Sequence, residues 1–118
     1  MPGILRISTP NSYSSAVQAG ETVYLGLHRG FGDRFADQLR GTFEGLKETL
    51  SRLDLTLENL VKVTVWLKNI QDLPEMEKLF NEYFNKDQFP ARMTATTEFI
   101  DVDCLIMIEG VAYRQAKQ

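Results

Sequence analysis

The alternation of apolar and polar residues predicts strands near the start of the chain and in its middle. Residues 5–19 are rich in serine and carry short alternations, which favours one or two short strands. Residues 22–25 are β-branched and aromatic and predict a stronger strand, which the glycine-containing loop 26–32 should end. In residues 61–68, valine and leucine alternate with lysine, threonine and tryptophan, the pattern of a half-buried strand. Trp66 falls on its polar face, where another subunit could cover it.

A helical period follows the first strands. Apolar residues recur every three or four positions and would line one face of a helix: Phe35, Leu39, Phe43, Leu46, Leu50 and Leu53. Asp33 is the expected N-cap, because its carboxylate can accept the free amide hydrogens of the first turn.

A second helix is predicted to begin at Asp72, which would cap it. Pro74 suits the first turn and Glu75 the capping-box position. Its apolar face would hold five residues, and the loop 85–90 would stop it: Met76, Leu79, Phe80, Tyr83 and Phe84.

Two final strands are expected at residues 91–99 and 104–114, joined as a hairpin through residues 100–103. This order predicts an α+β fold, with two helices on one face of a mixed sheet. The last strand is apolar on both faces, with Met107 and Val111 opposite Ile108 and Ala112. If the helices cover one face, something else must cover the other, and we expect oligomerisation.

The composition fits one globular domain over residues 1–118, with 43% hydrophobic and 25% charged residues. The net charge is −3 and the 13 Lys and Arg residues are scattered, which does not favour nucleic-acid binding. Cys104 is the only cysteine and is expected to be a core residue; with one histidine, a Cys/His metal cluster is excluded within one chain. We see no signal-peptide layout and no apolar run of about 18–20 residues, so a cytoplasmic protein without membrane contact is expected.

Two charged residues stand in apolar strands. Glu109 lies in the most hydrophobic strand, where a carboxylate is costly to desolvate unless it is paired or protonated. It is either a general acid/base that positions water or the partner of an arginine at a subunit junction. Arg92 begins the strand before it and is either a bidentate carboxylate anchor or a solvated strand-end residue. A histidine in a loop such as that of His28 is usually a solvated residue, and a catalytic role is the alternative. The glycines around it form no phosphate-binding motif.

The chain resembles the Rid (YjgF) family of reactive-intermediate deaminases over residues 13–114. Six segments carry the resemblance: YSSAV at 13–17, GETVYL at 20–25, NLVKVTVWLK at 59–68, MEKLFNEYF at 76–84, FPAR at 89–92 and IMIEGVA at 106–112. The resemblance implies a chorismate-mutase-like fold. It also implies a homotrimer with a barrel-like core and three clefts between neighbouring subunits.

The resemblance also implies roles for single residues. Arg92 would hold the substrate carboxylate, Glu109 would orient or activate water, and Tyr13 would close the cleft. Substrates would be 2-imino or enamine acids such as 2-aminoacrylate, hydrolysed to 2-keto acids and ammonia. No metal or cofactor is implied, because an imine carbon is already electrophilic.

Several positions depart from the family pattern. Gly26, Leu27 and His28 stand where deaminases usually have Ser-Gly-Gln, Glu77 replaces an asparagine, and Thr94 replaces a small or thiol residue. We expect Gly26, Leu27, Glu77 and Thr94 to belong to the substrate-binding set, with an altered specificity. The alternatives are a non-catalytic module that binds small carboxylic acids in the same cleft and a protein that acts on RNA or on other proteins.

Overall fold

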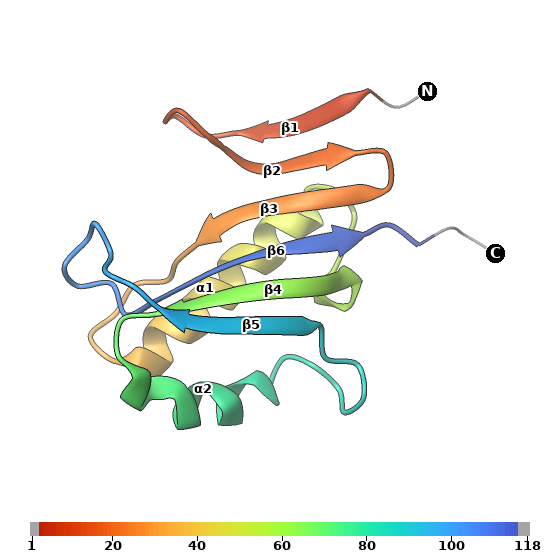
Figure 1. The fold of residues 1–118 in the computed structure, drawn as a ribbon. Helices are drawn as coiled ribbons and strands as arrows, with labels where there is room; N and C mark the ends of the chain where they lie inside the picture. Colours follow the sequence, from red (N-terminus) through yellow and green to blue (C-terminus); the bar gives the residue numbers. More distant parts are fainter. Residues whose placement is uncertain (1–2, 116–118) are drawn as a thin grey trace.

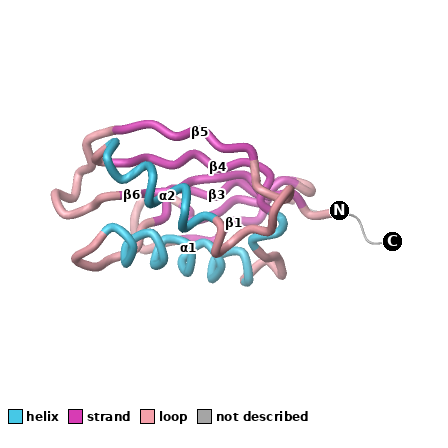
Figure 2. The backbone as a smooth tube through the Cα atoms, turned by 90° about the horizontal axis from the view of Figure 1, so that it is seen from below, coloured by secondary structure: helices cyan, strands magenta, loops and turns pink. Residues whose placement is uncertain are grey.

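The computed structural model describes residues 3–115 and contains one sheet and two helices. The elements run in this order: β1 (Ile4–Ser8), β2 (Ser14–Ala19), β3 (Thr22–His28), α1 (Phe35–Ser51), a 3-10 turn (Leu57–Asn59), β4 (Leu60–Leu67), a second 3-10 turn (Ile70–Asp72), α2 (Leu73–Phe80), β5 (Ala91–Thr96) and β6 (Ile106–Tyr113). The strands form a six-stranded sheet in the order β1-β2-β3-β6-β4-β5 (Figure 1). Both helices lie on the same side of it (Figure 2), which confirms the α+β fold with two helices on one face.

The expected hairpin between the last two strands is wrong. β5 pairs in parallel with β4 and lies at the edge of the sheet, whereas β6 lies between β3 and β4 and is antiparallel to both. Helix α2 connects β4 to β5, and such a crossover returns the chain in the parallel direction. β6 is the most apolar strand and takes the central position, where both of its edges are hydrogen-bonded.

Helix α1 packs its apolar face on the sheet, as its period predicts, but its start differs. Arg34 is the N-cap residue and no side chain caps the helix, so the assignment of this role to Asp33 is wrong. The point at which the helix begins is set instead by contacts between the preceding loop and α1. Gln38 and Thr42 are also buried on this face.

Helix α2 begins where the sequence predicts but is shorter. Asp72 is the N-cap residue and Pro74 lies in the first turn, yet the Asp72 side chain makes no capping hydrogen bond. The helix ends at Phe80, so Tyr83 and Phe84 lie in the turns that follow it. Their rings still join the core, because Tyr83 stacks on Phe43 with a centroid distance of 4.3 Å.

Two strand boundaries also differ from the expectation. β3 continues through Gly26 to His28, and its pairing with β6 shifts between Leu25 and His28, so the loop begins later than predicted. Val61 is 51% exposed, because the pairing of β4 with β6 shifts between Leu60 and Lys62 and takes Val61 out of the alternation.

The face of the sheet opposite the helices is left uncovered by residues 3–115 of the same chain. Trp66 and Met107 lie side by side there, since their backbones pair directly, and both are half-buried. Tyr24 and Met93, on the same face, are 54% and 55% exposed. The expectation that β6 is apolar on both faces is therefore met, with one face open. Within residues 3–115 no helix is long and apolar enough to cross a membrane.

Candidate functional site

Arg92 lies near the start of edge strand β5, and its side chain is on the helix side of the sheet. Its guanidinium forms an ion pair with Glu77 of α2 and lies 5.2 Å from the centroid of the Phe80 ring. The side chains of Arg92 and Glu77 are 26% and 54% exposed, so both can meet solvent. The planar cation is thus held between an anion and an aromatic face.

A hollow of about 410 Å³ opens beside this ion pair. Six residues line it: Glu77, Phe80, Asn81, Phe89, Pro90 and Arg92. The amide group of Asn81 donates hydrogen bonds to the carbonyl oxygens of Glu77 and Lys78, at 3.1 and 3.3 Å, and ties the end of α2. The hollow combines apolar walls with one positive and one negative group.

Glu109 leaves the sheet on the opposite face. Its backbone pairs with Thr64, whereas both Arg92 and Gly110 pair with Val63, which is fully buried under the helices. Directly paired residues share a face and successive residues alternate, so Arg92 is on the helix face and Glu109 on the open face. The structure therefore does not bring the two charged residues together within one chain. Glu109 is half-buried there.

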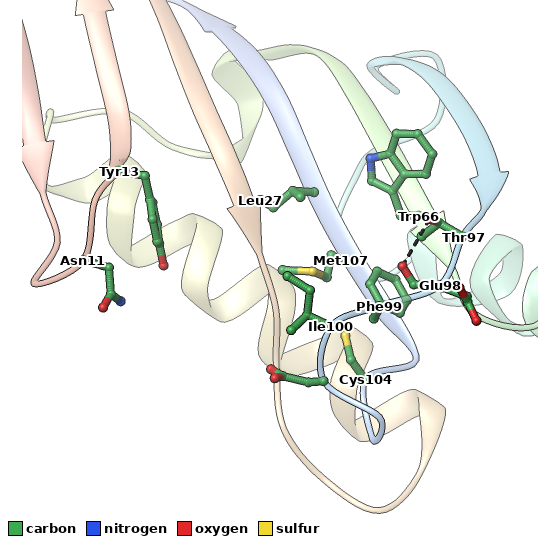
Figure 3. Close-up of a pocket in the computed structure, with 11 residues that line it drawn as sticks. Asn11, Tyr13, Leu27, Trp66, Thr97, Glu98, Phe99, Ile100, Cys104 and Met107 are labelled. Atoms are coloured by element: carbon green, nitrogen blue, oxygen red, sulfur yellow. Dashed lines mark hydrogen bonds between the residues drawn. The ribbon is translucent and has the colours of Figure 1, made fainter.

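A second hollow, of about 840 Å³, lies at one end of the open face (Figure 3). Tyr13 and Leu27, both expected at the site, line it and are 59% and 44% exposed. Trp66 and Met107 form its floor on the sheet. In Figure 3 the loop 97–104 lies on the side of the hollow opposite Tyr13. Trp66 lines the hollow but was not among the expected site residues. Its position could have been suspected from the sequence, because a large aromatic side chain stands at a polar position of its strand.

The side chain of Arg29 anchors the loop 97–104. Its side chain is only 9% exposed and donates hydrogen bonds to Asp101 and Asp103, at 3.1 and 3.3 Å, while its guanidinium lies 4.1 Å from the centroid of the Phe31 ring. The hydrogen bond from Arg29 lowers the pKa of the Asp103 carboxyl group. One buried cation therefore holds two carboxylates of the loop.

Gln38 of α1 fixes the same loop through its backbone. Its amide nitrogen donates to the carbonyl oxygens of Gly32 and Asp103, at 3.0 and 2.9 Å, and its amide oxygen accepts from the Leu105 N–H at 2.8 Å. The side chain is 1% exposed, so these three bonds form away from water. The wall of the second hollow is thereby joined to the first helix.

His28 packs between β3 and α1. Its Nδ1 lies 2.7 Å from the Gly26 carbonyl oxygen and its Nε2 lies 2.8 Å from the Thr49 hydroxyl oxygen. Burial lowers the pKa of the ring, which favours the neutral form, with Nδ1 donating and Nε2 accepting. Both ring nitrogens are thus engaged in the fold, which favours a packing role over catalysis.

The other expected site residues are spread over the sheet. Gly26 is half-buried in β3, next to the backbone of β2, and Thr94 is half-buried on the helix face of β5. Cys104 is buried beside the second hollow, and burial raises the pKa of its thiol. Among residues 3–115, no three His, Cys, Asp or Glu side chains are grouped as metal ligands would be.

Comparison with known proteins points to one family. The family model described as "Endoribonuclease L-PSP" matches residues 3–114. A "RutC family protein" of Pyrococcus horikoshii is 30% identical over 111 residues, which cover 87% of each chain. A "2-iminobutanoate/2-iminopropanoate deaminase" of Dermatophagoides farinae is 29% identical over 119 residues, covering 89% of this chain and 92% of that protein.

Solved structures agree on the fold. A yjgF family protein from Streptococcus pyogenes superposes with a TM-score of 0.88 at 28% identity, over 98% of this chain and all of the other. A YjgF family member from Neisseria meningitidis gives a TM-score of 0.91 at 18% identity, over 98% of both chains. The whole six-stranded sheet with its helices therefore recurs in these proteins.

Proposed function

The chain belongs to the endoribonuclease L-PSP family, whose members also carry the names RutC and YjgF, and from this membership we propose that it hydrolyses small 2-imino or enamine acids. The reaction would take place in clefts between the subunits of a homotrimer. The products are 2-keto acids and ammonia. The deaminase of Dermatophagoides farinae, similar over nine-tenths of its length, supports this reaction class.

The observation that carries the proposal is the placement of Arg92 and Glu109 on opposite faces of one sheet. The two can serve one substrate only if Arg92 of one copy meets Glu109 of a second copy. The open face that carries Trp66 and Met107 supports such an assembly, because an apolar face of this kind is stabilised when another subunit covers it.

In this cleft Arg92 anchors the substrate carboxylate through its planar fork of donors. Glu109 accepts a proton from water as the oxygen attacks the imine carbon, the electron pair of the C=N bond moves to nitrogen, and the nitrogen then takes up the proton from Glu109. The resulting carbinolamine then loses ammonia and becomes the 2-keto acid. An enamine substrate first takes a proton at its β-carbon and gives one up from its nitrogen to become the imine. Tyr13 covers the bound acid.

Anchoring the carboxylate fixes the imine carbon relative to the water, and this positioning supplies most of the rate advantage. The reaction needs no oxidant or reductant, since water adds and ammonia leaves.

A coupled assay tests the proposal. A pyridoxal-phosphate dehydratase generates 2-aminoacrylate beside the purified protein, and formation of the keto acid is followed. We expect the wild-type protein to accelerate it and Arg92→Ala to lose the effect, while Arg52→Ala, at an exposed arginine after α1, behaves as wild type. Equal rates with and without the wild-type protein would reject the deaminase.

A non-catalytic module that binds small carboxylic acids is the second candidate. One observation favours it: Leu27 lines the second hollow where the family usually has glycine. Binding of a keto acid that depends on Arg92, without turnover of the matching imine, would identify this function.

A further inference from the structure

We propose that Glu77 determines the charge selectivity of the site, so that the Arg92–Glu77 pair receives a zwitterion rather than a simple anion. In this arrangement Arg92 binds the carboxylate of a 2-iminium acid and Glu77 accepts a hydrogen bond from its protonated nitrogen. The inference rests on the proposed function for the identity of the substrate, but its geometry comes from the ion pair alone.

The Arg92–Glu77 pair is open to a ligand. Both side chains line the hollow of about 410 Å³, and Glu77 is 54% exposed. Within residues 3–115, Arg92 is the only side chain that the Glu77 carboxylate bonds. An ion pair this accessible is weak, so a ligand that satisfies both charges can separate it at little cost.

The charges that line the hollow favour a ligand with no net charge. Of the residues that the structure describes, Arg92 and Glu77 are the only charged ones that line it, and the rest of this lining is apolar apart from Asn81. A monocarboxylate placed on Arg92 would bring a second anion close to Glu77, and the apolar walls of Phe80 and Phe89 would strengthen the repulsion. A ligand with adjacent positive and negative groups leaves the site neutral.

The proposed substrate carries both charges that such a site would bind. A protonated 2-imino acid carries its carboxylate and its N–H⁺ group on neighbouring carbons, so one molecule can reach both side chains. Glu77 favours the protonated imine, whose carbon is more electrophilic than that of the neutral form. Water adds at this carbon while the C=N electron pair moves to nitrogen, and the iminium acid plus water gives the keto acid and ammonium with charge conserved.

The selectivity also assists turnover. The product keto acid has lost its nitrogen and is a monoanion, which Glu77 repels from Arg92. Glu77 thus distinguishes substrate from product at a site whose carboxylate anchor is the same for both.

Binding of two stable ligands of equal length tests the inference. Calorimetric titration compares 2-aminobutanoate, the zwitterion that stands in for the iminium acid, with 2-oxobutanoate, the monoanion. We expect the wild-type protein to prefer the zwitterion and Glu77→Gln to shift the ratio of the two dissociation constants by about tenfold toward the monoanion. Glu75→Gln, on the same helix but outside this hollow, should keep the wild-type ratio.

An unchanged ratio in Glu77→Gln, or no binding of either ligand to either variant, would overturn the inference. Because Glu77 is exposed, the amide variant should keep the wild-type melting temperature, which is measured alongside. The coupled deaminase assay separates the two proposals. Turnover with an unchanged ratio removes only the role of Glu77, whereas a shifted ratio without turnover supports that role and removes the deaminase.

Discussion

Gly30 and Gly41 lie in direct backbone contact between the loop after β3 and helix α1. A Cβ atom on Gly41 would lie 2.9 Å from the Gly30 Cα, and one on Gly30 would lie 2.3 Å from the Gln38 carbonyl oxygen. The Gly30 N–H donates to the Thr42 hydroxyl oxygen at 2.9 Å, and that hydroxyl donates to the Gln38 carbonyl oxygen at 2.8 Å. The loop that carries Arg29 is therefore seated on the helix by its backbone.

This contact predicts opposite effects for the same substitution at two glycines of α1. Gly41→Ala should lower the free energy of unfolding by about 1–3 kcal/mol, because backbone must move to admit the methyl group. Gly45→Ala should raise it by about 0.5–1 kcal/mol, since a Cβ there meets only the His28 ring, at 3.7 Å, and alanine favours helix. Urea unfolding measures both, and equal changes would contradict the contact.

Gln38 supports a second stability prediction. Gln38→Glu should lower the free energy of unfolding by on the order of 2–4 kcal/mol, because a buried carboxylate would face the carbonyl oxygens of Gly32 and Asp103. Gln88→Glu, at an exposed position, is the matched control and should change little. Amide exchange at Leu105, whose N–H bonds Gln38, should also become faster; protection as in the wild type would argue against the junction.

The single histidine makes the pH dependence of stability testable. Folding lowers the pKa of His28 below its ordinary value of 6.5 by burial, so the unfolded chain binds the proton first as the pH falls. The free energy of unfolding should therefore fall as the pH drops through 6.5 toward the lowered pKa of the folded state. Unfolding curves at pH 7.5 and 5.5 measure this, and His28→Gln should lack that part of the loss. Parallel curves for the two proteins would contradict it.

The proposed assembly predicts that a charge on the open face separates the subunits. Tyr24→Asp should give a smaller species in light scattering, because Tyr24 lies on the uncovered face and is 54% exposed. Glu44→Lys, a charge change on the exposed side of α1, should keep the wild-type mass. A wild-type protein that is already monomeric at high concentration would reject the homotrimer.

The proposed roles of two residues predict different kinetic changes. Glu109→Gln should lower kcat by about 10²–10⁴-fold with a smaller effect on KM, because it removes the proton acceptor for water. Arg92→Lys should mainly raise KM, since lysine keeps the charge but loses the planar fork. Steady-state rates with 2-iminobutanoate measure both. A large KM effect and an unchanged kcat in Glu109→Gln would assign it to binding instead.

The period of the apolar residues was enough to predict both helices, their common face and the open face of β6. It could not predict that β5 lies beside β4, because a pattern along one strand says which face is buried but not which strand is its neighbour. Capping was also missed: Asp33 has the right side chain for an N-cap, but the contacts of the preceding loop set the helix start.

For the site, the sequence and the family resemblance identified Arg92, Glu77, Tyr13 and Leu27, and their roles stay predictions. The ion pair between Arg92 and Glu77 could not be predicted from the sequence. The two residues are 15 positions apart, and only the placement of α2 along β5 brings them together. His28 was expected in a loop because glycines surround it. The strand reaches it through an irregular pairing that local sequence does not encode.

The central position of β6 has a consequence for how the chain folds. β6 hydrogen-bonds to β3 on one edge and to β4 on the other, and these two strands do not pair with each other. Without residues 106–113, no strand joins β1–β3 to β4–β5, and the edges of β3 and β4 that β6 covers have no partner in the sheet. The complete sheet can form only once β6 is available, and we expect nascent chains that still lack β6 to depend on chaperones that keep those edges from pairing with other chains.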